Sequence, residues 1–249
     1  MSDKKITIVV PARLESQRLK KKLLLSNTGK PLIVHTLENL KPLSELANIF
    51  LVTDSEEIKN VSKNHCDEVY FSTVECKSGT ERICNMLDKI HTDWVLNVQA
   101  DEPEIDVEDL KKLIASCTTQ SDKFEMATIG SKFTDAETFQ NPNAVKVVVD
   151  KNNKAMYFSR SVIPHSQNFN CDGVYHHIGI YAYKIELLKR WNSLPEGILE
   201  KEEKLEQLRA LENSISILVK PVSCAHKGID TQEDYDAFTK RELKKVNVR

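Results

Sequence analysis

The sequence predicts an α/β protein with a mostly parallel central sheet flanked by helices and with a smaller antiparallel lobe. The first observation is that short apolar runs at 6–10, 49–52, 69–71 and 94–98 alternate with helical patterns, which is typical of parallel sheets. The second is that turn signals separate the strand candidates of the second half, which favours antiparallel pairing.

Helical patterns follow the first three apolar runs. Pro31 suits the first turn of a helix, and the apolar residues of 33–40 recur at i, i+4 and i+7. The segment 54–57 reads as a capping box that opens the next helix. The segment 78–82 opens a third helix, whose apolar stripe extends to residue 90. At least three strand-helix units are therefore expected in the first ~115 residues.

The second half combines strands with tight turns. The turn signals are Asn152-Asn153 and Asp172-Gly173. Strands are expected at 126–129, 144–149, 155–158, 178–183 and 215–219. Helices are expected near 185–191, 199–211 and 233–246.

Composition indicates one domain with two lobes. The 249 residues are 40% hydrophobic and 29% charged, and they contain no repeat or Pro/Gly/Ser linker. We expect a single domain over 1–249, with a first lobe at about 1–120, a second at about 121–230 and a C-terminal helix at 231–249. A net charge of −2 gives no basic field for nucleic acid or an anionic membrane.

Processing and redox signals are weak. The start lacks the apolar core of a signal peptide, and no run approaches the roughly 18 apolar residues of a membrane span, so a cytoplasmic protein is expected. The six cysteines are scattered without CxxC spacing, which favours reduced thiols over zinc binding or disulfides.

One strand ends in a cluster of polar side chains. The stretch WVLNVQADEP begins as a buried strand and then places Gln99, Asp101 and Glu102 within a few residues. Ligands of open parallel sheets bind at the carboxyl ends of the strands, where a carboxylate can hold Mg²⁺ together with phosphate oxygens. The alternative is that Asp101 and Glu102 cap a helix that begins near residue 107.

The loop after the first strand is basic. In PARLESQRLKKKLL, five cations lie within ten residues of an otherwise slightly acidic chain. Guanidinium and ammonium groups are the usual partners of phosphate oxygens. Neither a GxGxxG nor a GxxxxGK[ST] motif is present, so side chains would hold the phosphates. The alternative is a solvated basic loop. The cations are Arg13, Arg18, Lys20, Lys21 and Lys22.

Ten blocks in order carry a family resemblance. They extend over about 6–236, nearly end to end, and together they resemble the 3-deoxy-manno-octulosonate (Kdo) cytidylyltransferases, also called CMP-Kdo synthetases. The blocks are PARLESQRLKKKLL, NTGKPLIVHTLENL, VTDSEEI, SGTER, NVQADEP, NPNAVKVVVD, YFSRSVIP, HIGIYAY, LEKEEKLEQLR and GIDTQED.

The resemblance implies a nucleotide-diphospho-sugar transferase-like fold and a reaction. Members of the family make CMP-Kdo and pyrophosphate from CTP and the acidic sugar Kdo, with Mg²⁺, for lipopolysaccharide biosynthesis. They are typically cytoplasmic homodimers, and their partners include neither nucleic acid nor membrane.

The resemblance also implies site residues. The catalytic set is Arg13, Lys22, Asp101 and Asp230, of which Asp101 and Asp230 would bind the metal. The nucleotide-binding set is Arg13, Arg18, Lys22, Ser78, Gly79, Arg82 and Gln99. The sugar-binding set is Arg160, His177, Tyr181, Glu203 and Gln207.

Several of these residues have an alternative reading. His177 could be a satisfied polar residue at a strand edge, and Tyr181 is favoured as core packing unless its strand lines the pocket. Glu200, Glu203 and Gln207 share one helical face, which a solvated helix would show equally.

Departures from the family pattern bear on activity. The usual RLPGKPL is here Arg18 to Leu24 without its two prolines and glycine, and the usual QGDEP has Ala100 in place of glycine. If that glycine had positive φ or lay against the ligand, the Ala100 methyl would cause strain or a clash. The usual Arg-His pair is His176-His177, which removes a cation. No presumed metal ligand is lost, so an active enzyme with altered kinetics or substrate preference is favoured.

Two other functions remain open. One is a cytidylyltransferase for a related acidic sugar, of the sialic acid or amino-Kdo type. The other is a catalytically silent relative that binds nucleotide or a partner protein. Pyrophosphate release with a panel of sugars would separate the three.

Overall fold

The computed structural model describes residues 4–16, 18–165, 172–223 and 228–247. The chain divides into two compact units. Unit 1 comprises 1–92, 97–107 and 226–249, and unit 2 comprises 93–96 and 108–225. Each unit is described separately below.

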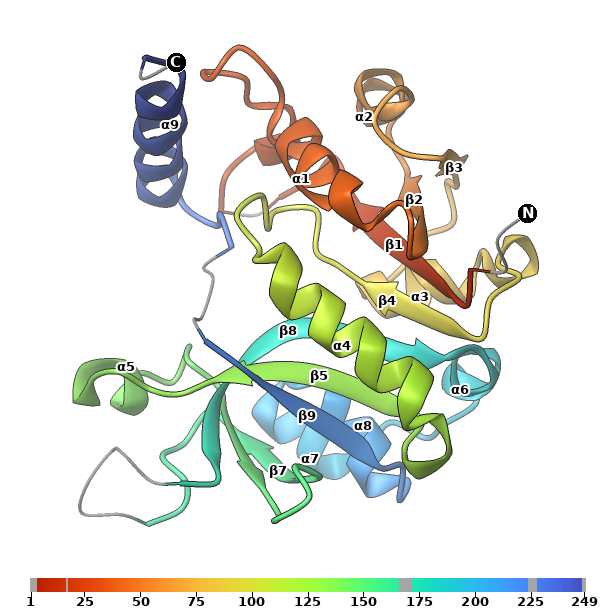
Figure 1. Ribbon diagram of the computed structural model, residues 1–249, viewed down its shortest axis with the longest axis vertical. Coiled ribbons are helices and arrows are strands. Elements are labelled where there is room, and N and C mark those ends of the chain that lie inside the picture. The colour runs from red at the N-terminus through yellow and green to blue at the C-terminus, as the bar shows by residue number, and fades with distance from the viewer. Residues whose placement is uncertain (1–3, 17, 166–171, 224–227, 248–249) are drawn as a thin grey trace. The chain divides into compact units, whose positions relative to one another are not determined.

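Unit 1 contains a parallel sheet in the order β3-β2-β1 (Figure 1). Strand β1 (Ile6–Ala12) is buried along its whole length and pairs in parallel with β2 (Ala47–Thr53), which pairs in parallel with β3 (Glu68–Phe71). Beyond β4, the amide of Val98 donates to the carbonyl of Val9 at 3.1 Å, so the chain leaves a buried ladder just before Gln99.

The helices of unit 1 have local sequence causes. Helix α1 (Leu32–Leu40) starts after Pro31, and its apolar face is fully buried. Ser55 caps α2 (Glu56–Ser62), and Ser78 caps α3 (Gly79–Cys84). The remaining elements are η1 (Lys22–Leu24), η2 (Lys41–Leu43), η3 (Leu87–Lys89) and α9 (Gln232–Asn247).

Unit 2 contains a mixed sheet. Strand β5 (Met126–Ser131) lies between β8 (Val174–Lys184), to which it is antiparallel, and β9 (Ile217–Val222), to which it is parallel (Figure 1). Strand β6 (Lys146–Val149) pairs antiparallel with β7 (Ala155–Ser159) and with β8. Asn153, with φ 59°, and Gly173, with φ 86°, supply the left-handed turns that the sequence predicts.

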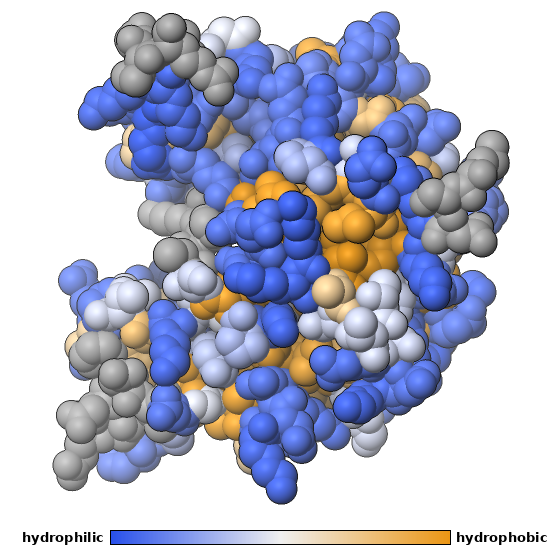
Figure 2. Space-filling model, viewed as in Figure 1, coloured by the Kyte–Doolittle hydropathy of each residue, from blue (hydrophilic) through white to orange (hydrophobic). Residues whose placement is uncertain are grey.

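The other elements of unit 2 surround this sheet. Helix α4 (Val107–Thr119) is amphipathic: Leu110 and Leu113 are buried, while Glu108 and Lys112 are exposed on the hydrophilic outer side seen in Figure 2. Strand β4 (Trp94–Asn97) is itself part of the sheet and lies next to β8. The rest are η4 (Ser121–Lys123), α5 (Ala136–Gln140), α6 (Ile185–Trp191), α7 (Ile198–Glu203) and α8 (Gln207–Glu212).

The predicted fold class is confirmed, and each expected strand is present with bounds shifted by a few residues. Three helical predictions are wrong in detail. The helix expected at 199–211 is broken by Lys204, which is left-handed at φ 53°. The helix expected over 78–90 ends at Cys84. The cap of α2 is Ser55 alone, because Asp54 turns to Arg82 instead.

Two further expectations concern cysteines and membranes. Cys66, Cys76, Cys84 and Cys117 form no disulfide among the described residues, and Cys171 and Cys224 lie outside them. Within the part of the chain that the structure describes, no helix has both the length and the apolar character that crossing a bilayer requires.

Candidate active site

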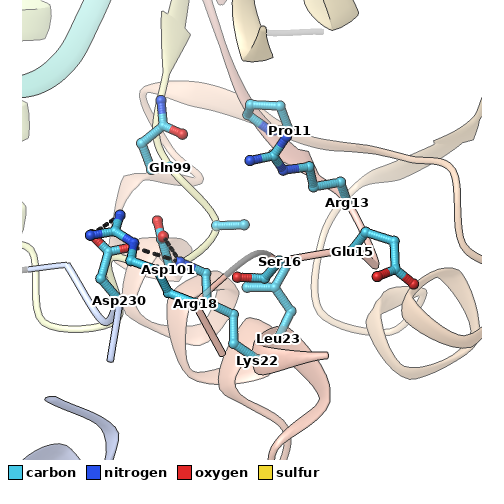
Figure 3. Close-up of a pocket in the computed structure, with 11 residues that line it drawn as sticks. Pro11, Arg13, Glu15, Ser16, Arg18, Lys22, Leu23, Gln99, Asp101 and Asp230 are labelled. Atoms are coloured by element: carbon cyan, nitrogen blue, oxygen red, sulfur yellow. Dashed lines mark hydrogen bonds and ion pairs between the residues drawn. The ribbon is translucent and has the colours of Figure 1, made fainter. Parts of the chain in front are cut away.

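Unit 1 has a cavity of about 300 Å³ where β1 and the segment after β4 leave the sheet. Its walls come from three parts of the chain: the loop after β1, the segment 99–101 and the start of the C-terminal segment. Figure 3 shows the side chains. They are Pro11, Arg13, Glu15, Ser16, Arg18, Lys22, Leu23, Gln99, Ala100, Asp101 and Asp230.

Lys22 joins the two carboxylates of this cavity. Its Nζ donates to Asp101, to Asp230 Oδ1 at 3.0 Å and to the carbonyl of Ile229 at 3.0 Å. The Lys22 side chain is only 13% exposed, whereas that of Asp230 is 39% exposed. Two carboxylates from distant parts of the sequence therefore converge on one cation.

Arg18 adds a second positive charge to the cluster. Its Nη2 lies 2.8 Å from Asp230 Oδ2 (Figure 3), and its side chain is largely exposed. Arg13 also lines the cavity but stands apart from this cluster, and no ion pair or hydrogen bond of its side chain is found among the described residues. Arg13 is thus available to an incoming anion.

The backbone fixes both carboxylates. The amide of Ile229 donates to the carbonyl of Asp101 at 2.9 Å, which ties the two acidic segments together. Asp234 accepts from the amides of Asp230 and Thr231, as a side chain does at the start of a helix such as α9. These bonds hold the two backbone segments that carry the carboxylates.

Ala100 is accommodated without backbone strain. It is absent from the described residues with positive φ, so the strain considered for this position does not arise. Its carbonyl accepts from the buried hydroxyl of Thr36 at 2.8 Å, and the residue itself lines the cavity. The methyl group therefore narrows the cavity, and it does not distort the backbone.

Glu102 is a buried acid beside the cluster. Burial, together with the negative charges of Asp101 and Asp230, raises its pKa to about 8. Its Oε2 has no hydrogen-bond partner within the part of the chain that the structure describes. Helix α4 begins at Val107, several residues later, so neither Asp101 nor Glu102 is at its N-cap. The alternative reading of these two carboxylates as helix caps is therefore wrong.

A smaller cavity of about 150 Å³ shares Arg13 and Gln99 with the first. It is lined by the SGTER segment as well as by the end of β1. A Cβ added at Gly79 would lie 3.1 Å from the ring of Pro11, so a glycine allows α3 to approach β1. The lining residues are Pro11, Ala12, Arg13, Cys76, Lys77, Ser78, Gly79, Arg82 and Gln99.

Arg82 is held at the wall of this smaller cavity. Its Nη2 donates to Asp54 Oδ2 at 2.9 Å, while Asp54 Oδ1 accepts from the amide of Leu14. The side chain is 8% exposed, and its buried Nη1 has no partner among the described residues. The two N–H groups of Nη1 on a positioned guanidinium are thus left for a ligand.

The donor set of the larger cavity fits a divalent cation. Mg²⁺ prefers one or two carboxylates together with phosphate oxygens and water. Asp101 and Asp230 already flank one positively charged atom, the Nζ of Lys22, which marks the point on which both carboxylates converge. Among the described residues no group of three or more His, Cys, Asp or Glu side chains is placed to hold a metal ion together, so further ligands would come from substrate and water.

The predicted sugar-binding residues lie in unit 2. Arg160 and Glu203 contact each other: Glu203 accepts from the amide of Arg160 at 2.9 Å and from the hydroxyl of Ser159. The Arg160 guanidinium donates to the carbonyls of Glu203, Pro142 and Lys204 at 2.8, 3.2 and 3.5 Å. The guanidinium therefore links two loops of unit 2.

His177 and Tyr181 pack against each other. Their ring centroids are 5.3 Å apart, and the ring of His177 also meets Phe158 edge-on at 5.0 Å. Burial, with a smaller effect of His176, lowers the pKa of His177 to about 3, so the ring is neutral at pH 7. Burial raises the pKa of Tyr181.

Gln207 is also buried. It begins α8, and its Nε2 has no partner. The sequence places Glu200 on the same helical face as Glu203 and Gln207. Glu200 is instead buried and paired with Arg209 at 2.7 Å, because the helix breaks between Glu203 and Gln207. The prediction of one shared face over 200–207 is wrong.

The cations of the basic loop have two different roles. Arg13, Arg18 and Lys22 line the cavity, whereas the exposed Lys21 pairs with Glu57. Sequence reasoning missed Glu15 and Ser16, whose place in the loop after β1 was the available signal. It also missed Asp54, the partner of Arg82, and Lys146, a fully buried lysine of unit 2 that no local pattern distinguishes.

Comparison with known proteins shows the family of the chain. Residues 7–217 match the cytidylyltransferase family. The chain belongs to this family, and the resemblance to CMP-Kdo synthetases is confirmed.

Relatives with two stated sugars are equally similar. The 3-deoxy-manno-octulosonate cytidylyltransferase of Francisella tularensis subsp. holarctica (strain LVS) is 38% identical over 245 residues, covering 94% of this chain and 97% of the relative. The 8-amino-3,8-dideoxy-manno-octulosonate cytidylyltransferase of Shewanella halifaxensis (strain HAW-EB4) is 38% identical over 232 residues, covering 92% and 95%.

A solved structure is similar over nearly the whole chain. It is a CMP:2-keto-3-deoxy-manno-octonic acid synthetase complexed with CTP, at 32% identity and a TM-score of 0.90, covering 97% of this chain and 99% of that chain. The nucleotidyltransferase class follows from the family.

Proposed function

We propose that the protein transfers CMP from CTP to the anomeric hydroxyl of 3-deoxy-D-manno-octulosonate, which gives CMP-Kdo and pyrophosphate for lipopolysaccharide biosynthesis. The observation that carries this proposal is the convergence of Asp101 and Asp230 on one cation, beside Arg13 and Arg18, in the larger cavity. Such a site suits a triphosphate with a divalent metal.

The reaction brings an anionic sugar to a polyanion. The sugar hydroxyl attacks the α-phosphorus, its proton is lost, and the bond to the bridging oxygen breaks so that pyrophosphate leaves. Arg13, Arg18 and Lys22 would bind the phosphate oxygens and stabilise the charge that develops on them. Asp101 and Asp230 would hold Mg²⁺, which when bound offsets repulsion and lowers the pKa of the hydroxyl.

The smaller cavity suits another part of the nucleotide. Ser78, Gly79, Arg82 and Gln99 are the proposed nucleotide contacts there, and the unpartnered Nη1 of Arg82 supports this assignment. Because Arg13 lines both cavities, it is placed to contact a ligand that spans them.

The proposed sugar contacts are the five residues of unit 2. Arg160 would bind the sugar carboxylate with its planar guanidinium. It would do so by releasing its two longest hydrogen bonds, to the carbonyls of Pro142 and Lys204. Neutral His177 and Tyr181 would offer hydroxyl contacts without adding charge. Glu203 and Gln207 complete the proposed set. We further propose that the lobe at about 1–120 binds nucleotide, that the lobe at about 121–230 binds sugar and forms a homodimer, and that the enzyme is cytoplasmic.

A second candidate sugar is the 8-amino-3,8-dideoxy analogue of Kdo. The equal identity to relatives named for the two sugars is the observation that favours it. His176 stands where the family usually has arginine. Burial and the charge of Lys146 lower the pKa of His176, so unit 2 has one positive charge fewer at this position.

A substrate panel tests the proposal. Purified protein with CTP and Mg²⁺ is given Kdo, its 8-amino analogue or a sialic acid, pyrophosphate is measured, and the nucleotide product is weighed by mass spectrometry. We expect the highest kcat/KM with Kdo. A preference of tenfold or more for the amino sugar or the sialic acid would replace the assigned sugar, and CTP binding without turnover would identify a silent relative.

A further inference from the structure

We propose that the ammonium of Lys22 occupies the cation position between Asp101 and Asp230 in the nucleotide-free protein, and that it thereby makes metal binding depend on prior or simultaneous nucleotide binding. This inference rests on the proposed function for its purpose. Its evidence, however, is the geometry of the free protein alone.

The position of Lys22 is that of a bound cation. Its Nζ has three oxygen neighbours: the carboxylates of Asp101 and Asp230 (Figure 3), and the carbonyl of Ile229 at 3.0 Å. Carboxylate and carbonyl oxygens are also the ligands of hard divalent cations. A metal ion bound by both carboxylates would need the space that Nζ fills.

Charge in the cluster is balanced without a metal. Asp101 and Asp230 carry two negative charges, and Lys22 and Arg18 touch them with two positive charges. Mg²⁺ gives up its water reluctantly, so it needs uncompensated negative charge to bind. While Lys22 and Arg18 remain paired with Asp101 and Asp230, the cluster has little uncompensated negative charge.

A triphosphate would release the carboxylates. Its anionic oxygens provide new partners for Lys22 and Arg18, after which Asp101 and Asp230 are free to bind the metal. Linkage makes this effect reciprocal, so metal and nucleotide favour each other's binding. Lys22 is then a positioning residue for the metal site before it contacts phosphate.

The test measures Mn²⁺ binding to nucleotide-free protein by calorimetry and by the free-ion EPR signal. Variants are Lys22→Met and Lys22→Gln; Lys21→Met is the matched control because its partner is Glu57, outside the cluster. Removing one positive charge next to the site should tighten Mn²⁺ binding by about tenfold or more. Lys21→Met should bind like wild type.

A second pair of measurements guards against misfolding. Mn²⁺ should raise the melting temperature of Lys22→Gln more than that of wild type, and adding Asp101→Asn to Lys22→Gln should remove the gain. If neither Lys22 variant binds Mn²⁺ more tightly than wild type, including the case in which none binds measurably, the inference is wrong. These binding measurements do not depend on turnover. If Lys22→Gln binds Mn²⁺ more tightly but the substrate panel shows no enzyme activity, only the proposed function is refuted.

Discussion

Lys22 in unit 1 and Lys146 in unit 2 both have shielded side chains, but their ammonium groups have different partners. Lys22 donates to two carboxylates and one carbonyl at the wall of a cavity. Lys146 is fully buried and donates to the carbonyls of Asn141 and Arg160 at 2.9 and 2.8 Å. Carboxylates in a cavity can exchange a lysine for a ligand, whereas the two part-buried carbonyls bonded to Lys146 tie a fully buried side chain to neighbouring loops.

The same contrast holds for the arginines. Arg13 makes no bond through its side chain within the described residues, and Arg18 makes one exposed ion pair, so both can bind an anion at little cost. Arg160 instead donates to three carbonyls of unit 2. The partner type therefore distinguishes a charge held for a ligand from a charge that joins loops.

The largest effect is expected for Asp101→Asn. The amide keeps the size of the side chain but removes one of the two converging charges, so pyrophosphate release with CTP, Mg²⁺ and Kdo should fall by roughly 10³-fold. Asp88→Asn, a surface carboxylate of the same unit, is the control. Retention of more than a tenth of the activity in Asp101→Asn would mean that this carboxylate does not serve the reaction.

Lys146→Met should affect the fold. The substitution removes both hydrogen bonds of a fully buried side chain and leaves two part-buried carbonyls without their donor, so the free energy of unfolding should fall by about 1–3 kcal/mol in urea titrations. Arg18→Met, which removes an exposed pair, should change it by less than about 0.5 kcal/mol. Equal effects of the two substitutions would remove the distinction between the charges of the two units.

His177→Phe should alter how stability depends on pH. The folded-state pKa of about 3 lies below the ordinary value of 6.5, so the stability that this residue contributes is present above pH 6.5 and is lost as pH falls toward 3. Between pH 7.5 and 5.5, wild type should lose about 1.4 kcal/mol more than the variant in urea titrations. Parallel pH curves would show that His177 takes up protons in the folded protein.

The smallest effect is expected for Lys21→Gly. Lys21 has φ 48° in the position where the family pattern RLPGKPL has its glycine. Relief of this left-handed strain should raise the free energy of unfolding by about 0.5–1 kcal/mol, less whatever the exposed pair with Glu57 contributes. Thermal unfolding followed by circular dichroism measures it. A lower melting temperature in the variant would show that the ion pair outweighs the strain.

Strands and the site edge were predictable from local patterns. Apolar runs bounded by polar residues located β1 and β4, and parallel topology placed Arg13 and Asp101 at the same edge because both follow those strands. Asp230 came only from the family resemblance, since nothing near it in the sequence shows that its segment returns to Asp101.

Partner choice was not predictable, because it depends on contacts distant in sequence. Lys146 lies in an apolar strand, and no local pattern indicates that its ammonium donates to the carbonyls of Asn141 and Arg160. The break at Lys204 is a single left-handed residue within a good helical pattern. Asp54 looked like a helix cap, but a buried guanidinium competed for it.

The most direct test of the central claim, that the cavities of unit 1 bind the nucleotide, is a calorimetric titration of CTP with Mg²⁺ into Arg13→Met. Arg13 lines both cavities and has no side-chain partner within the described residues, so its loss should weaken CTP binding by about tenfold or more while the melting temperature stays the same. Arg190→Met, which removes an exposed arginine of unit 2, should bind CTP like wild type. Wild-type affinity in Arg13→Met would contradict the assignment of these cavities.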